Sequence, residues 1–231
     1  MKDLFELMLY PHNIVLLALL VACVAYRKKG LWLIFAFYYL SGNTFIANQL
    51  RQLYVQQLET ASPAVGSQMV VLGCGGSATS LPACAKARLS DALARLPEPA
   101  ALVLTSEYCQ PYVDYVLSQH KNLVVECFNG GENTYQEFNT LKQRGINPDY
   151  ILSSDYHSWR VEQLARYHGF TAKVLASSTY TFRPVNCGAE CFISINLSNF
   201  DFYSKMIAEF SSYAVFVLTR QWVDWYQPAN G

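Results

Sequence analysis

The segment Ile151–Arg160, which reads ILSSDYHSWR, holds the densest group of side chains that could do chemistry. An apolar run ends in small hydroxyl residues and passes directly into a helical pattern that carries His157 and Arg160. These two residues are three apart, so they share one face of the first helical turn. Two such cations oppose the helix dipole, whereas a bound anion would be favoured by both and by the backbone N–H groups. The pattern predicts an anion site, with a plain surface pair as the alternative.

Three further polar loops follow apolar runs that resemble strands. They are Gly73-Cys74-Gly75-Gly76, then Thr105-Ser106-Glu107, then the NGGENT stretch that ends at Thr134. The carboxyl ends of parallel strands share one edge of a sheet, so these loops are expected to meet the His157 turn there. Glycines in the first loop would let backbone N–H groups approach a ligand closely, although an ordinary turn explains them equally well.

Two neighbouring features bear on this edge. Thr134 and Glu137 have the spacing of a capping box, which predicts a helix start at Thr134 and explains Thr134 structurally. Glu132 and Asn133 are left on the rim without such a role. Arg88, in the second turn of a preceding helical stretch, could reach the same edge, and a solvated side chain is the equally simple alternative.

The elements that must position these loops alternate between strand and helix. Strands are expected at Met69–Gly73, Ala101–Thr105, Leu123–Cys127, Tyr150–Ser153 and Lys173–Ala176, and helices at Ala83–Leu96, Tyr112–Gln119, Thr134–Arg144 and Tyr156–His168. This order predicts an α/β fold, a three-layer Rossmann-like domain with a mainly parallel sheet. Phe192–Ile195 is expected to add an edge strand, and Phe200–Tyr226 to form a long aromatic-rich helix.

Two apolar runs precede the α/β pattern, at Ile14–Tyr26 and Leu31–Leu40. Each approaches the roughly 20 residues that cross a bilayer, so they predict an N-terminal transmembrane helical hairpin. A cleaved signal peptide with one anchor and a pair of buried soluble helices are the alternatives. The Arg27-Lys28-Lys29 link favours the cytoplasmic side, which would place everything after Gln52 in the periplasm of a bacterium, beyond its inner membrane.

The expected organisation is therefore a hairpin in residues 1–50, a linker in 51–67 and an α/β domain with a C-terminal helix in 68–231. The chain has 17 basic and 17 acidic residues, and this balanced, interspersed charge argues against nucleic acid as a partner.

Six cysteines follow the hairpin: Cys74, Cys84, Cys109, Cys127, Cys187 and Cys191. An even number in an oxidising compartment permits disulfides, with Cys187–Cys191 and Cys109–Cys127 as possible pairs, and unpaired thiols are the alternative. The spacings of zinc sites are absent, so no metal or other cofactor is expected.

Taken together, the segments VVLGCGG, GGENT and SSDYHSWR, with Arg88 between the first two, resemble the SanA/ElyC/YdcF family of bacterial envelope proteins. The resemblance covers about Met69–Pro184, and the preceding hairpin is similar to that of ElyC. It departs from the family at Thr105-Ser106-Glu107, where members often have a Ser/Thr-Gly-Gly turn. The resemblance implies a Rossmann-like domain, attachment to the inner membrane and a role in envelope or peptidoglycan biogenesis.

The expected function is binding of a phosphate- or carboxylate-bearing envelope intermediate, such as a lipid-linked glycan, with hydrolysis or transfer as the reaction class. His157 would act as general acid or base, and Glu132 would orient it or activate water. The expected ligand-binding residues are Gly73, Gly75, Gly76, Arg88, Ser106, Asn133, Thr134, Ser154 and Arg160. The alternatives are a non-catalytic scaffold for envelope synthases and a nucleotide- or S-adenosylmethionine-binding domain.

Overall fold

The computed structural model describes residues 10–55, 62–97, 100–119, 123–179 and 182–226, and it divides into two compact units. The first, here called the α/β unit, is Gln57–Thr179, and the second, the helical unit, combines Met1–Gln56 with Tyr180–Gly231. This division differs from the expected boundaries, because the C-terminal helix packs with the N-terminal helices and belongs to their unit. Residues 56–61 of the expected linker and residues 1–9 of the expected hairpin lie outside the described residues.

The α/β unit contains a five-stranded, all-parallel sheet with the order β3-β2-β1-β4-β5. The strands are β1 Gln68–Leu72, β2 Ala101–Thr105, β3 Val124–Phe128, β4 Tyr150–Ser154 and β5 Lys173–Ser177. The chain steps from β1 to β2 and β3 in one direction and then returns to place β4 on the other side of β1. This confirms the Rossmann-like α/β prediction, and such a reversal is where α/β folds form ligand sites.

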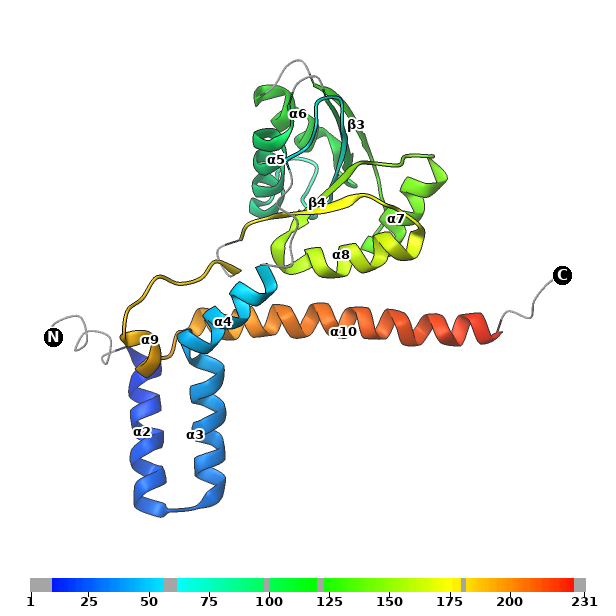
Figure 1. The fold of residues 1–231 in the computed structure, drawn as a ribbon. Coiled ribbons are helices and arrows are strands. Elements are labelled where there is room, and N and C mark those ends of the chain that lie inside the picture. The colour runs from blue at the N-terminus through cyan, green and yellow to red at the C-terminus, as the bar shows by residue number, and fades with distance from the viewer. Residues whose placement is uncertain (1–9, 56–61, 98–99, 120–122, 180–181, 227–231) are drawn as a thin grey trace. The chain divides into compact units, whose positions relative to one another are not determined.

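Helices cover both faces of the sheet, which gives three layers (Figure 1). They are α5 Ala83–Arg95 and α6 Cys109–Gln119 on one face, and α7 Thr134–Gln143 and α8 Asp155–His168 on the other. The central strands are apolar nearly throughout because both of their faces are buried: Met69 and Val70 of β1 point to opposite sides and are each fully buried.

The helical unit contains α2 Pro11–Tyr26, α3 Lys29–Gly42, α4 Thr44–Val55, α9 Glu190–Ile193 and α10 Leu197–Tyr226. A left-handed residue, Arg27, ends α2 and turns the chain so that α2 and α3 form a helical hairpin (Figure 1). Among the described helices, none combines the length and the apolar character that a membrane crossing requires.

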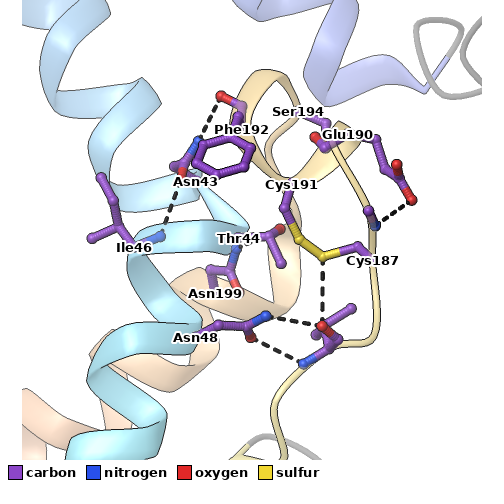
Figure 2. Close-up of a disulfide and its surroundings, with 12 residues drawn as sticks. Asn43, Thr44, Ile46, Asn48, Cys187, Glu190, Cys191, Phe192, Ser194 and Asn199 are labelled. Carbon is purple, nitrogen blue, oxygen red and sulfur yellow. Dashed lines mark hydrogen bonds between the residues drawn. A yellow bond between two sulfur atoms is a disulfide. The ribbon is translucent and has the colours of Figure 1, made fainter.

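The expected edge strand at Phe192–Ile195 does not form: Phe192 and Ile193 end the short helix α9, and Ile195 makes only an isolated antiparallel bridge with Asn43. Figure 2 shows the side-chain contacts that hold the loop before and around α9. The side-chain amide of Asn48 in α4 accepts from the N–H of Val185 at 3.0 Å and donates to the carbonyl of Val185 at 2.9 Å. The side-chain amide of Asn43 donates to the carbonyl of Phe192 at 3.1 Å. A Cys187–Cys191 disulfide closes the same loop. Side-chain amides thus satisfy part of the backbone of this loop.

Candidate functional site

A cavity of about 520 Å³ lies at the carboxyl edge of the sheet, where the loops after β1, β2 and β3 meet the first turns of α8. Nine of the predicted site residues line it: Gly73, Gly75, Gly76, Ser106, Glu132, Asn133, Thr134, His157 and Arg160. The sequence interpretation did not assign a site role to five others in the lining: Thr105, Glu107, Tyr108, Gly131 and Glu137. Because the strands are parallel, the loops after them meet at one edge of the sheet, as expected.

His157 and Arg160 lie together on the cavity wall, both half-buried. Nη2 of Arg160 is 3.1 Å from Nδ1 and 3.0 Å from Nε2 of His157. A guanidinium can only donate, so the contact requires a ring nitrogen that carries no proton. The pair therefore holds a neutral imidazole whose unprotonated nitrogen accepts from a fixed cation, and the two side chains meet as predicted from their shared helix face.

Arg88 and Ser154 do not line the cavity. Arg88 is only 2% exposed and donates from Nε to the Ser154 hydroxyl at 3.0 Å. Its Nη1 donates to the carbonyls of Leu72 and Gly73 at 2.8 and 2.7 Å. Burial lowers the pKa of Arg88, while Tyr156 and Glu137 oppose that shift. Arg88 thus links the end of β1 to the end of β4. This structural role differs from the expected anion-binding role, because the guanidinium is buried against the strand ends and does not reach the cavity.

The first two N–H groups of the glycine loop are used within the protein. The N–H of Gly73 is shared between Thr105 Oγ1 at 3.0 Å and Glu137 Oε1 at 3.1 Å, and the N–H of Cys74 donates to the Tyr112 hydroxyl at 3.1 Å. A Cβ at Gly73 would overlap the carbonyl oxygen of Thr105. Gly73 is therefore required for the close approach of the ends of β1 and β2. Its N–H connects the end of β1 to Thr105 of β2 and Glu137 of α7.

Glu137 is one of the five lining residues without a predicted site role, and the sequence interpretation gave it a different one. The capping box predicted for it does not form: Asn133 is the N-cap of α7, accepting from the N–H of Gln136 at 3.0 Å. Glu137 instead points to the cavity floor, where it accepts a 2.6 Å bond from the Thr105 hydroxyl. Gly130 leaves room for this contact, because a Cβ there would lie 2.9 Å from both Glu137 Cγ and Thr105 Cβ.

Burial is the main influence on Glu137, which is 8% exposed, and it raises the pKa of this carboxyl group. The hydrogen bonds from Thr105 and Gly73 and the charges of Arg88 and Arg160 act in the opposite direction, but burial prevails. The cavity thus has a buried acid on its floor, beside the exposed carboxylates Glu107 and Glu132 at its mouth.

Two disulfides border the cavity. Cys74, between two lining glycines, pairs with Cys84 at the start of α5. Cys109, directly after the lining residue Tyr108, pairs with Cys127 of β3, which confirms one of the two pairs considered from the sequence. The Cys187–Cys191 pair is the other. The loops after β1 and β2 are thus covalently attached to α5 and β3.

Among the described residues, no cluster of His, Cys, Asp and Glu side chains is arranged to hold a metal ion. The chain matches no protein-family model, no curated protein and no solved structure.

Proposed function

We propose that the α/β unit binds an anionic envelope intermediate, a phosphate- or carboxylate-bearing glycan of the kind carried on a lipid. The single observation that carries this proposal is the convergence of Arg160 and His157 with hydroxyl groups in one cavity at the carboxyl edge of a parallel sheet. A guanidinium fixed in this way recognises phosphate and carboxylate oxygens. The resemblance to the SanA/ElyC/YdcF family supports the envelope as the setting.

The exposed carboxylates of the lining favour a ligand that carries hydroxyl groups as well as an anionic group. Glu107 and Glu132 are exposed at the mouth of the cavity and can accept hydrogen bonds from hydroxyl groups of a sugar. A lone dianion would be held by Arg160 but would leave these two acids without a hydrogen-bond donor. A glycan with one anionic group satisfies both Arg160 and the acids, so it fits the cavity better than phosphate alone.

His157 and Glu132 supply the groups for a reaction on such a ligand. A bound anion that draws the Arg160 guanidinium away from the ring would free the unprotonated nitrogen of His157 to act as a general base. Glu132 is exposed, so it can contact a water molecule or orient His157. We propose hydrolysis or transfer at a phosphate or glycosyl bond as the reaction class.

We further propose that the hairpin anchors the protein in an inner membrane, with the α/β unit on the periplasmic side. Large apolar side chains are exposed around α2 and α3, among them Val21, Leu33 and Phe37 at 60%, 72% and 73%. Lipid would cover such a surface. Disulfides in the α/β unit suit an oxidising compartment. The basic Arg27-Lys28-Lys29 turn favours the cytoplasmic side.

The proposal is tested by thermal denaturation of the full-length protein in detergent with phosphosugars, envelope precursors, nucleotides and S-adenosylmethionine. A phosphosugar or precursor is expected to raise Tm of the wild type, and Arg160→Ala and His157→Ala are expected to abolish this rise. Arg166→Ala is the matched control, because Arg166 lies on the same helix and forms only a surface ion pair with Glu162. An equal rise in wild type and Arg160→Ala would contradict the proposed site.

A second candidate function is a non-catalytic scaffold that contacts envelope synthases. The observation in its favour is the exposed apolar face of α10, which includes Ile207, Phe210, Val215 and Leu218. If this function is correct, Arg160→Ala and His157→Ala support growth like the wild type in cells that lack the native copy. Ile207→Ser combined with Val215→Ser then abolishes that support.

A further inference from the structure

Thr134 differs from most buried polar residues of the α/β unit because its hydroxyl group has no structural task. Asn133 is the N-cap of α7 and accepts from the N–H of Gln136, so the helix does not use the Thr134 hydroxyl as a cap. Thr134 is only 6% exposed, yet neither its hydroxyl nor its N–H is hydrogen-bonded to any residue that the structure describes. A buried donor without a partner costs free energy, so it indicates a ligand.

The start of α7 opens onto the cavity. Gly131, Glu132 and Asn133, which precede the helix, line the cavity together with Thr134. Thr134 is the first residue of the helix, so its N–H points out of the helix end and has no acceptor within the helix. The hydroxyl of Ser153 is buried without a partner and closed off from solvent, whereas that of Thr134 keeps solvent access, and the space that Thr134 borders is the cavity.

Ser106, which follows β2, supplies a second hydroxyl group to the lining. It is also 6% exposed, and its Oγ accepts from the N–H of Tyr108 at 3.3 Å. The hydroxyl proton itself has no acceptor among the described residues. The neighbouring Thr105 is different, because its hydroxyl already donates to Glu137 at 2.6 Å. Ser106 and Thr134 thus each keep a proton that they can donate to a ligand.

We propose that Ser106 and the start of α7 form, together with Arg160, a subsite for a phosphoryl group. The substrate class is then phosphate esters of sugars, and carboxylate-bearing glycans are poorer ligands. This inference rests on the proposed function of the same cavity and decides between the two anions that it allows. The N-terminal end of a helix carries a partial positive charge, and its N–H groups bind phosphate oxygens in many proteins.

The arrangement of the donors favours a phosphoryl group over a carboxylate. The donors come from three separate elements: Ser106 from the loop after β2, Thr134 from the start of α7 and Arg160 from α8. A phosphoryl group presents three oxygens in a tetrahedral arrangement, so each element can contact a different oxygen. A carboxylate presents two oxygens in one plane, which leaves at least one of the three elements without an acceptor of its own.

The charge of the lining makes each of these hydrogen bonds important. The lining contains three acidic side chains, from Glu107, Glu132 and Glu137, and one guanidinium group, from Arg160. An excess of positive charge therefore does not hold the anion, and directed hydrogen bonds have to supply the affinity. Hydrogen bonds to a charged group are stronger than those to a neutral one, so the loss of a single donor is expected to have a large effect.

The subsite is tested by calorimetric titration of the full-length protein in detergent with glucose 1-phosphate and glucuronate, two sugars with different anionic groups. Wild type is expected to bind glucose 1-phosphate roughly tenfold more tightly than glucuronate. Thr134→Val, which keeps the branched shape, and Ser106→Ala are each expected to weaken binding of glucose 1-phosphate roughly tenfold. Thr134→Ser keeps the hydroxyl and should bind like the wild type. Thr171→Val is the control, since Thr171 is exposed and lies outside the lining.

The outcomes separate this subsite from the proposed function. Undiminished affinity for glucose 1-phosphate in both Thr134→Val and Ser106→Ala, with loss of binding in Arg160→Ala, would overturn the subsite and leave the proposed function intact. Tighter binding of glucuronate than of glucose 1-phosphate by the wild type would overturn the choice of phosphate. If the wild type binds neither sugar, the proposed function fails, and the subsite that depends on it fails as well.

Discussion

At the scale of single residues, two buried ionisable groups of the α/β unit respond to pH in opposite directions. His168, at the end of α8, is 7% exposed, and its Nε2 has no hydrogen-bond partner among the described residues. The rings of Tyr135 and Tyr167 pack against it at centroid distances of 4.8 and 5.0 Å. Burial, and then the charge of Lys142, lower the pKa of His168, whereas burial raises that of Glu137.

The sign of each shift predicts how stability changes with pH. His168 has a folded pKa below its ordinary value of 6.5, so its contribution is present above about pH 6.5 and is lost as pH falls through the folded pKa. Glu137 has a folded pKa above 4.5, so its contribution is present below about pH 4.5 and is lost as pH rises through the folded pKa. The free energy of unfolding is expected to fall less between about pH 7.5 and pH 5.5 in His168→Phe than in the wild type.

Urea denaturation at the two pH values measures this difference. The Phe ring keeps the aromatic packing and removes the buried charge that acid would create. Lys173→Ala, an exposed change in the same unit, is the control and should follow the wild type. If His168→Phe loses as much stability as the wild type on acidification, the account of His168 is incorrect.

Gly73 gives a steric prediction at the cavity floor. Gly73→Ala would push a methyl group into the carbonyl of Thr105, so the backbone must move and the bonds to Glu137 must lengthen. The free energy of unfolding is expected to fall by about 1–3 kcal/mol or more. Gly30→Ala is the control, since a Cβ there has no neighbour within 4 Å and Gly30 lies in a helix. Chemical denaturation checks both variants, and a neutral Gly73→Ala would refute the steric argument.

At the scale of elements, the disulfides attach the cavity loops to their neighbours. Cys74–Cys84 closes a loop of ten residues between β1 and α5. The Cys74→Ser, Cys84→Ser double variant is expected to lose about 2–3 kcal/mol of stability. The matched control is Cys187→Ser with Cys191→Ser, because that pair lies in the helical unit. Calorimetry should show a lower Tm of the α/β transition in the first variant alone, and equal shifts would contradict this.

The strands and helices of the α/β unit were predictable from sequence, whereas several contacts were not. Apolar runs such as Ala101–Thr105 are unambiguous because a strand buried on both faces has little polar content. Glu137 was misassigned because its spacing from Thr134 also satisfies a capping box, and only tertiary packing selects between the two roles. Arg88 was misplaced for a similar reason, since helical spacing does not reveal that its side chain reaches carbonyls at the end of β1.

At the scale of the whole molecule, the hairpin of α2 and α3 exposes many large apolar side chains. Leu33 and Phe37 of α3 are more than 70% exposed, so lipid contact is proposed for them. Leu33→Lys with Phe37→Lys is expected to weaken membrane association, at a cost of about 2.5–3.5 kcal/mol for each charge at the centre of a bilayer. Val124→Lys is the matched control, because Val124 is 73% exposed on β3 of the α/β unit.

Sedimentation with washed membranes checks this expectation. The double variant should shift to the supernatant, while the wild type and Val124→Lys should remain with the membranes. If all three proteins sediment equally, or if the wild type is found in the supernatant, the hairpin is not the anchor. A reporter fused after residue 231 tests the orientation, and activity restricted to the cytoplasm would contradict a periplasmic α/β unit.

The central claim is that an anion binds in the cavity between the His157 turn and the glycine loop. The most direct measurement is a crystal structure of the protein grown with tungstate, an oxyanion that anomalous scattering locates without bias. An anomalous peak is expected within hydrogen-bond distance of the Arg160 guanidinium, and its loss is expected in Arg160→Ala. Peaks confined to other surfaces, with an empty cavity in the wild type, would contradict it.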